Sequence, residues 1–169
     1  MKTILNTIIA GLAAVFITVA GDATAQEAYD LSQLPPAVRS AAQEAREAQT
    51  LAIRAAGRAQ FRVAGTVTFF SDTDAAYLGE GIGTGDNEQR DGHGISSWAD
   101  GEYYAGEFVG AGSTSGSGDM HGYGVYAFVN GHIYEGQWRN EQRHGYGVQW
   151  TPDGQVYFAG VWRAGQPVD

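Results

Sequence analysis

The sequence lacks cysteine altogether and contains a single lysine, Lys2. Without cysteine there is no disulfide framework, no thiolate zinc site, no cysteine nucleophile and no attachment point for a lipoprotein anchor. Because no lysine follows position 2, a Schiff-base mechanism is excluded from the rest of the chain. Positive charge is scarce too, with a formal net charge of −9 over 169 residues. Such an acidic chain offers no basic surface to a phosphate backbone, so we expect no nucleic-acid partner.

Several common ligand-binding motifs are also missing. The 25 glycines form neither Gly-x-Gly-x-x-Gly nor a phosphate loop ending in Gly-Lys, and no serine lies in a Gly-x-Ser-x-Gly elbow. We therefore expect no cofactor and no catalytic serine. Glycine is nevertheless about twice as frequent as its usual ~7 per cent share, so the fold must require it.

The first 25 residues are typical of an export signal. Lys2 precedes a mostly apolar stretch over residues 3–20, and Ala23-Thr24-Ala25 is the small-x-small pattern that signal peptidases cleave. The stretch is slightly short of the ~20 residues that a membrane span needs. We expect cleavage after Ala25 and a periplasmic or secreted protein; an uncleaved anchor is the alternative.

Residues 26–62 are expected to form a lead segment and an amphipathic helix that begins near Pro36 and ends near Arg58. One face of this helix carries Val38 and alanines at helical spacing, and the opposite face is polar. Its arginines outnumber its acids, whereas residues 63–169 carry 14 acids and 4 arginines, a balance of −10. The simplest interpretation is attraction between the two halves of the chain; a helix that binds a partner is the alternative.

An internal repeat occupies residues 92–169, and a degenerate copy is expected in residues 63–91. The segments that begin at Gly92, Gly122 and Gly145 share Gly-x-Gly-aliphatic and end in Asp-Gly or Asn-Gly. The last two copies are 23 residues apart, and the first two are separated by seven more because of a Gly/Ser-rich insertion within residues 110–118.

Each copy has the pattern of a β-hairpin. Asp100-Gly101, Asn130-Gly131 and Asp153-Gly154 are dipeptides that favour two-residue turns with positive φ. On the returning strand, Tyr134, Gly136 and Trp138 alternate with polar Glu135 and Gln137. We expect aromatic rings of one strand to lie across the glycines of the next, which would explain the glycine content.

The run from Tyr134-Glu135-Gly136-Gln137-Trp138 to His144-Gly145-Tyr146-Gly147 resembles the MORN repeat, a unit of about 23 residues written roughly YxGxWxxGxxHGxG. The resemblance implies a mainly β fold: an elongated, single-layer antiparallel sheet of stacked MORN-type hairpins, here preceded by one amphipathic helix. It also implies scaffolding and dimerisation and, in eukaryotic members, phospholipid binding. The acidic repeat region argues against the lipid role in this chain.

The aromatic rows are the candidate binding face. Exposed Tyr and Trp on an open sheet suit a sugar ring, an extended peptide or the apolar surface of a partner. Alternatively, the alanine-rich helix or a second copy of the chain covers part of this face. The candidate residues are Tyr104, Phe108, Tyr134, Trp138, Phe158 and Trp162.

No metal site and no catalytic site is expected. His121 and His144 share a repeat position, but equivalent strands are about 9.6 Å apart, too far for two imidazoles on one zinc ion. Glu107 and Glu135 could act as a pair of carboxylates in glycoside hydrolysis, yet the pattern places both on the polar face of the strands, among solvated charges. We therefore expect a non-enzymatic module that contacts a protein partner or itself as a homodimer, with a carbohydrate- or cell-wall-binding module as the alternative.

Overall fold

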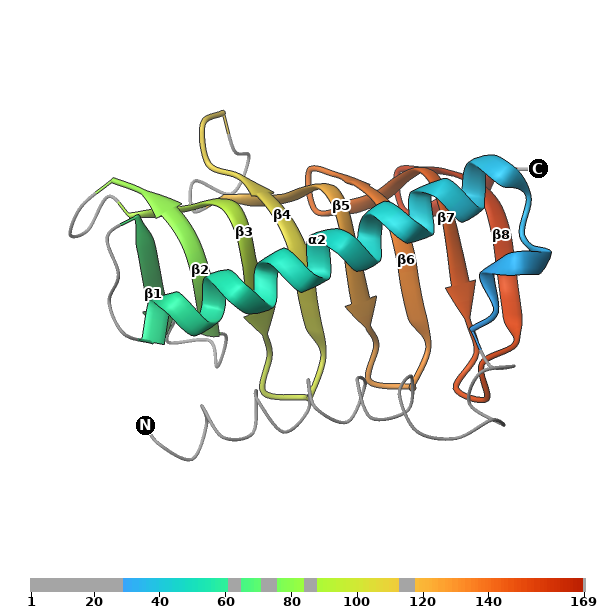
Figure 1. The fold of residues 1–169 in the computed structure, drawn as a ribbon, viewed down its shortest axis with the longest axis horizontal. Helices are drawn as coiled ribbons and strands as arrows, with labels where there is room; N and C mark the ends of the chain where they lie inside the picture. Colours follow the sequence, from blue (N-terminus) through green and yellow to red (C-terminus); the bar gives the residue numbers. More distant parts are fainter. Residues whose placement is uncertain (1–28, 61–64, 71–75, 84–87, 113–117, 169) are drawn as a thin grey trace.

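The computed structural model describes residues 29–60, 65–70, 76–83, 88–112 and 118–168. The expected signal segment lies outside these residues. Within them, one long helix packs along an antiparallel sheet of nine strands whose order in space follows their order in the chain (Figure 1). No helix in the described ranges is long and apolar enough to cross a membrane.

The helix α2 (Pro36–Gln60) follows a short 3₁₀ turn, η1 (Leu31–Gln33). Its proline at the first position needs no hydrogen bond from its nitrogen, which favours a helix start there. The expected apolar stripe is confirmed, because every member is buried against the sheet: Val38, Ala41, Ala42, Ala45, Ala48, Ala52, Ala55, Ala56 and Ala59. Small side chains let the helix axis lie close to the strands over almost the whole length of the sheet (Figure 1).

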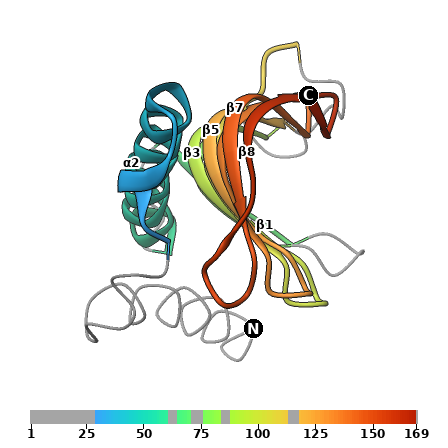
Figure 2. The same ribbon diagram turned by 90° about the vertical axis from the view of Figure 1, so that its right-hand side faces the viewer.

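The strands are joined only to their neighbours in sequence, as expected for stacked hairpins. They are β1 (Thr66–Phe70), β2 (Ala76–Ile82), β3 (Gln89–Ser97), β4 (Tyr103–Val109), β5 (Asp119–Ala127), β6 (Ile133–Arg139), β7 (Gln142–Trp150), β8 (Val156–Arg163) and β9 (Gln166–Val168). The mainly β fold class is thereby confirmed. Viewed along the sheet, the strands bend so that their two ends turn away from the helix (Figure 2).

The sheet has two chemically different faces. The helix face carries mostly small and aliphatic side chains, which pack against α2: Leu78, Ile95, Ala105, Val125, Val148 and Ala159. The aromatic face lies on the other side and holds the rings of Tyr77, Tyr104, Phe108, Tyr126, Tyr134, Trp138 and Trp162. Because strand residues alternate between faces, one repeat supplies both layers.

The Asp-Gly and Asn-Gly dipeptides do form hairpin turns, but the prediction of two-residue turns is wrong at these sites. Trp98 and Glu102 close a three-residue loop through Trp98 N–H to the Glu102 carbonyl at 2.9 Å, and Gly101 N–H bonds the Trp98 carbonyl at 3.1 Å. In this loop Gly101 alone has positive φ, +97°. The same bonds recur at the next two loops, so each is a three-residue turn that ends in glycine.

Two-residue turns occur at the opposite ends of the strands. Asn140 and Glu141 connect β6 to β7, and Ala164 and Gly165 connect β8 to β9, all four with positive φ. At the corresponding point between β4 and β5 the chain runs from residue 110 to 118, which accounts for the seven-residue insertion. Residues 113–117 of it lie outside the described ranges.

Candidate interaction site

Each repeat places an aromatic ring at the same position of the aromatic face: a tyrosine on β2, β4 and β6, and Phe158 on β8. Tyr77, Tyr104 and Tyr134 occupy equivalent positions, and each hydroxyl donates to the backbone carbonyl three residues later, at 2.6, 2.9 and 3.0 Å. The bond holds each ring flat across two glycines of adjacent strands. A methyl group at Gly94, Gly124 or Gly147 would overlap the ring. The prediction that rings and glycines fit together is therefore confirmed.

The six candidate binding residues form one chain of ring contacts. Edge-to-face pairs join Phe108 to Tyr104 at 5.1 Å between centroids, Tyr104 to Trp138 at 5.3 Å and Trp138 to Tyr134 at 5.2 Å. The chain continues through Trp162 to Phe158 at 5.3 and 5.1 Å. Such contacts contribute about 0.5–1.5 kcal/mol each beyond the area that they bury.

This packing corrects two expectations. The aromatic residues are not an exposed surface, because Tyr104, Phe108, Tyr134, Trp138 and Trp162 are all buried and Phe158 is half-buried. The helix does not cover them either, since it lies on the opposite face (Figure 2). Burial instead comes from the rings themselves, which overlap across glycines that offer no side chain to separate them.

Burial also fixes the chemical state of these tyrosines. It raises the pKa of Tyr77, Tyr104 and Tyr134 well above the ordinary value for a phenol. They therefore remain neutral hydroxyl donors at any physiological pH. Whether the aromatic face binds a ligand stays a prediction, and the burial removes the open ring surfaces on which a sugar would stack.

Two arginines on the aromatic face were missed by sequence reasoning. The Arg143 guanidinium carbon lies 4.3 Å from the ring centroid of Trp162, and that of Arg90 lies 5.2 Å from that of Phe108. Arg143 also donates to Gln149 Oε1 at 2.6 Å and to the Gly165 carbonyl at 2.7 Å, and burial lowers its pKa. A signal was available, because both arginines stand two residues before the Gly-x-Gly of their repeats.

The helix face carries a second repeated contact. Side-chain oxygens of Glu80, Glu107 and Gln137 accept the backbone N–H groups of His93, Tyr123 and Tyr146 at 2.7–2.8 Å. The glycine before each donor has positive φ and leaves room for the acceptor. Because β2 supplies both Tyr77 and Glu80, it repeats the contacts of β4 and β6.

The two carboxylates considered for catalysis lie in different surroundings. Glu107 is engaged by the Tyr123 N–H, whereas Glu135 is buried beneath the helix. Its carboxylate accepts from Arg46 Nε at 2.9 Å and from Trp150 Nε1 at 3.2 Å. Burial raises its pKa, and Arg46 and Trp150 oppose that change. The expectation that Glu135 is solvated is therefore wrong.

The histidines are distributed along the sheet. His93 lies between two carboxylates, with Nδ1 3.3 Å from Glu80 and Nε2 3.8 Å from Glu107. His132 contacts Gln149, and the Nδ1 atom of His121 is buried with no hydrogen-bond partner. Among the described side chains, no three His, Asp or Glu residues gather in an arrangement that could hold a metal ion.

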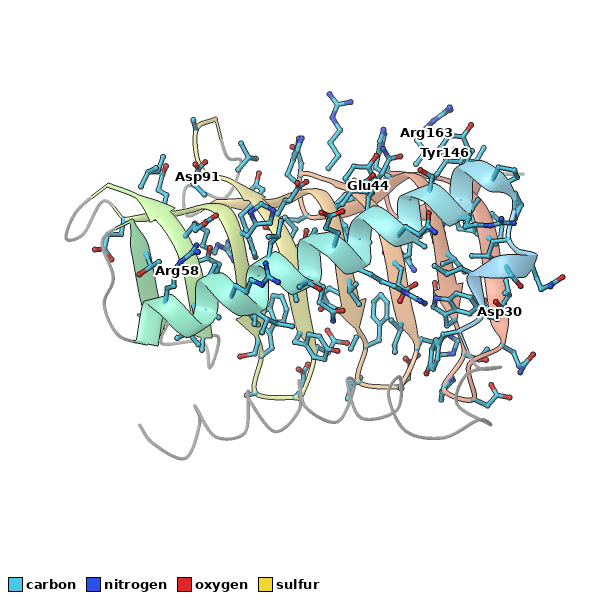
Figure 3. The ribbon with its side chains drawn as sticks, viewed as in Figure 1. Asp30, Glu44, Arg58, Asp91, Tyr146 and Arg163 are labelled. Carbon is cyan, nitrogen blue, oxygen red and sulfur yellow. The ribbon has the colours of Figure 1, made fainter. Side chains whose placement is uncertain are left out.

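An uncovered apolar row lies at the C-terminal end of the helix face. Tyr146, Val161 and Val168 are cross-strand neighbours on β7, β8 and β9. Tyr146 is 45% exposed and Val161 36%, and Val168 is half-buried. Figure 3 shows Tyr146 and Arg163 at the border of the sheet near this end. We call these three residues the apolar row.

Comparison with protein-family models identifies the MORN repeat in three segments, residues 88–103, 117–133 and 134–156. A search of curated protein sequences found no match to the chain. The matched segments cover β3 and the start of β4, then β5, and then the β6–β7 hairpin with its following loop. These three segments are therefore MORN repeats.

Proposed function

We propose that the chain is an exported, non-enzymatic module that contacts other protein chains, further copies of itself included. MORN repeats are generally modules for contacts with proteins or membranes. The apolar row is the observation that carries the proposal. It is a surface of neighbouring apolar side chains on a sheet whose other apolar side chains are mostly buried by α2 or by one another.

The equivalent positions on β2, β3, β4 and β6 are polar, and Tyr123 on β5 is half-buried and accepts a hydrogen bond from Gln137 Nε2 at 3.2 Å, which supports a specific contact at one end. On β2, β3 and β4 they are held by Glu80, His93 and Glu107, which are bonded to one another or to the backbone. On β7 and β8 they are held by Tyr146 and Val161. Exposed apolar side chains that adjoin one another mark interaction surfaces more often than isolated ones do.

A capture experiment tests this proposal. The full chain serves as bait in an envelope extract, beside the double variant Tyr146→Ser/Val161→Ser and a control, Val129→Ser. Val129 is 68% exposed but lies in a hairpin loop away from the apolar row. We expect a protein partner to be retained by the wild type and by the control and lost by the double variant.

A glycan-binding screen of the same samples addresses the carbohydrate alternative. Binding of a glycan with no protein captured would contradict the proposal and favour a cell-wall-binding module. Export is tested separately, by the intact mass of protein recovered outside the cytoplasm. We expect that protein to begin at Gln26, and retention of Met1 would favour the anchor.

A further inference from the structure

The last hairpin contains one residue more than the two before it, and that residue is an exposed aromatic. Two residues separate the turn glycine from the ring on the aromatic face in the hairpins that begin at β3 and β5, whereas three do so in the hairpin that begins at β7. On β7, Gln149 and Trp150 are consecutive, but their partners on β8 are residues 158 and 156, so Tyr157 is the extra residue of a β-bulge. It is 63% exposed, unlike the buried rings of the aromatic face. Because bulges re-aim side chains and often adjoin functional sites, Tyr157 is a candidate ligand contact.

A chain of hydrogen bonds beside Tyr157 determines which ring nitrogen of His132 carries a proton. A guanidinium can only donate, so the 2.6 Å bond from Arg143 Nη1 requires the side-chain oxygen of Gln149 to face Arg143. The side-chain nitrogen of Gln149 then lies 3.1 Å from His132 Nδ1, and an amide nitrogen can only donate. The Nδ1 atom is therefore the acceptor, and the neutral imidazole carries its proton on Nε2.

This Nε2–H group is open to a ligand. Within the described residues, the Nε2 atom of His132 has no hydrogen-bond partner and is not one of the buried polar atoms that lack a partner, so solvent reaches it. The rings of His132 and Tyr157 pack edge to face, with 5.3 Å between their centroids and an angle of 80° between their planes. The two side chains thus place a fixed N–H donor beside an exposed aromatic ring.

We propose that Tyr157 and His132 form a subsite for one ring of a neutral sugar. The carbon-bound hydrogens on one face of a sugar ring pack against an aromatic ring, and its hydroxyl oxygens accept hydrogen bonds from N–H donors. The net charge of −9 disfavours nucleotides and acidic sugars, which the chain repels. Proline-rich peptides dock in grooves lined by several aromatic side chains, whereas the other exposed aromatic residue of the described ranges, Tyr146, lies on the helix face. The subsite goes beyond the proposed function and uses a different surface from the apolar row.

Proton–nitrogen correlation NMR of the full chain tests the donor without any ligand. At about pH 8, where an ordinary histidine is neutral, we expect the His132 ring of the wild type to be protonated on Nε2. Gln149→Leu removes the group that selects this form, so we expect a mixture of the two ring forms. Gln155→Leu, which replaces an exposed glutamine in the nearby hairpin loop, is the control and should match the wild type. A wild-type ring protonated on Nδ1 would overturn the proposal.

Calorimetric titration with cellotriose and with the trimer of N-acetylglucosamine, two neutral probes, tests sugar binding by the full chain. We expect at least one probe to bind the wild type and Tyr157→Phe, which keeps the aromatic ring. Tyr157→Ser removes the ring and His132→Phe removes the donor, so each should raise the dissociation constant by about tenfold. Tyr146→Ser removes an exposed tyrosine from the other surface and should bind as the wild type does. We expect no binding of trigalacturonate, an acidic sugar, or of decaproline.

Three results of the titration would overturn the subsite: neither neutral sugar binds the wild type, Tyr157→Ser binds a sugar as tightly as the wild type does, or decaproline binds in place of a sugar. The failure of the proposed function would look different. Tyr146→Ser/Val161→Ser should lose the captured protein and keep sugar binding, whereas Tyr157→Ser should lose sugar binding and keep the captured protein. If a protein is captured but no sugar binds, the subsite is wrong and the proposed function stands.

Discussion

At the scale of single residues, glycine acts in two opposite ways. Gly147 lies under the ring of Tyr134, so a Cβ atom there would overlap the ring. Gly57 lies near the C-terminal end of α2, and a Cβ atom there would meet nothing within 4 Å. The first glycine is required by packing, whereas the second weakens a helix.

The same substitution should therefore have opposite effects at these two positions. We expect Gly147→Ala to lower the free energy of unfolding by about 1–3 kcal/mol, because the Tyr134 ring must move and its hydrogen bond is lost. We expect Gly57→Ala to raise it by about 0.5 kcal/mol through helix propensity. Urea denaturation followed by circular dichroism measures both. Equal destabilisation would contradict the role given to Gly147.

Glu135 differs from the residues at the same position in the other repeats, and this difference positions the helix. The equivalent residues are Leu78, Ala105 and Ala159. Of these four positions, Glu135 alone places a carboxylate beneath the helix. A smooth alanine stripe offers little to distinguish one helix position from another. The Arg46–Glu135 ion pair fixes the position of the helix along the sheet. Setting the alignment of two elements is the best-attested role of a buried ion pair.

A double-mutant cycle tests this pair. We expect Arg46→Met to lower the free energy of unfolding by about 3 kcal/mol, because it leaves the Glu135 carboxylate buried with Trp150 as its remaining donor. The double variant Arg46→Met/Glu135→Leu should recover most of that loss, since it replaces the pair by apolar groups of similar size. Thermal and urea melts of the wild type, of Arg46→Met, of Glu135→Leu and of the double variant complete the cycle. An additive outcome would show that the two side chains do not interact.

At the scale of elements, the hairpins show which parts of the structure can be predicted from sequence. The helix with its stripe, the alternation of strand residues and the fit of rings to glycines all follow from periodicity and residue type. The side of the sheet taken by the helix does not follow from the Tyr134–Trp138 strand, whose alternate residues are the polar Glu135 and Gln137. The other repeats place Leu78, Ala105 and Ala159 at the position of Glu135, so this position is aliphatic in those repeats and polar at Glu135.

Turn geometry and ring burial are harder to predict from the sequence, for physical reasons. An Asp-Gly dipeptide suits both a two-residue turn and the end of a three-residue loop, and the choice depends on where strand pairing stops. The burial of Tyr104 and Trp138 depends on overlap between strands, which no single repeat contains. The Arg90–Phe108 and Arg143–Trp162 contacts each join the two strands of one hairpin, so they depend on the register of strand pairing.

Two substitutions in the two-residue turns should change the melting temperature in opposite directions. Ala164 has φ of +49°, a conformation costly for alanine, and Gly165 follows it. We expect Ala164→Asn to raise the melting temperature by a few degrees, because Asn-Gly is the preferred pair for this turn. Glu141→Gly should lower the melting temperature despite its φ of +66°, since the Glu141 carboxylate accepts the Met120 N–H at 2.9 Å. Differential scanning calorimetry measures both; a lower value for Ala164→Asn would contradict the turn assignment.

At the scale of the whole molecule, the positive helix and the acidic sheet neutralise each other by direct contact. Arg46 pairs with Glu135, and Arg58 pairs with Glu80 at 2.6 Å. Arg39 donates to the carbonyls of Ser32 and Leu34 at the start of the helix. Attraction between the two halves of the chain, expected from the sequence, thus takes the form of specific ion pairs that occupy much of the positive charge of the helix.

This arrangement predicts how the protein behaves at an anionic membrane. A negative surface attracts basic segments by about 1 kcal/mol per residue, and here the repeat region carries a balance of −10. The apolar stripe of α2 is buried against the sheet and consists mainly of alanine, so it offers no bulky side chains for insertion. We expect no co-sedimentation of the full chain with phosphatidylserine-containing vesicles at physiological salt, and at most weak binding at low salt that salt removes. Arg46→Met/Glu135→Leu serves as a control, because it leaves the net charge unchanged and should behave as the wild type does. Binding that persists at high salt would contradict the electrostatic argument and favour a lipid partner over a protein.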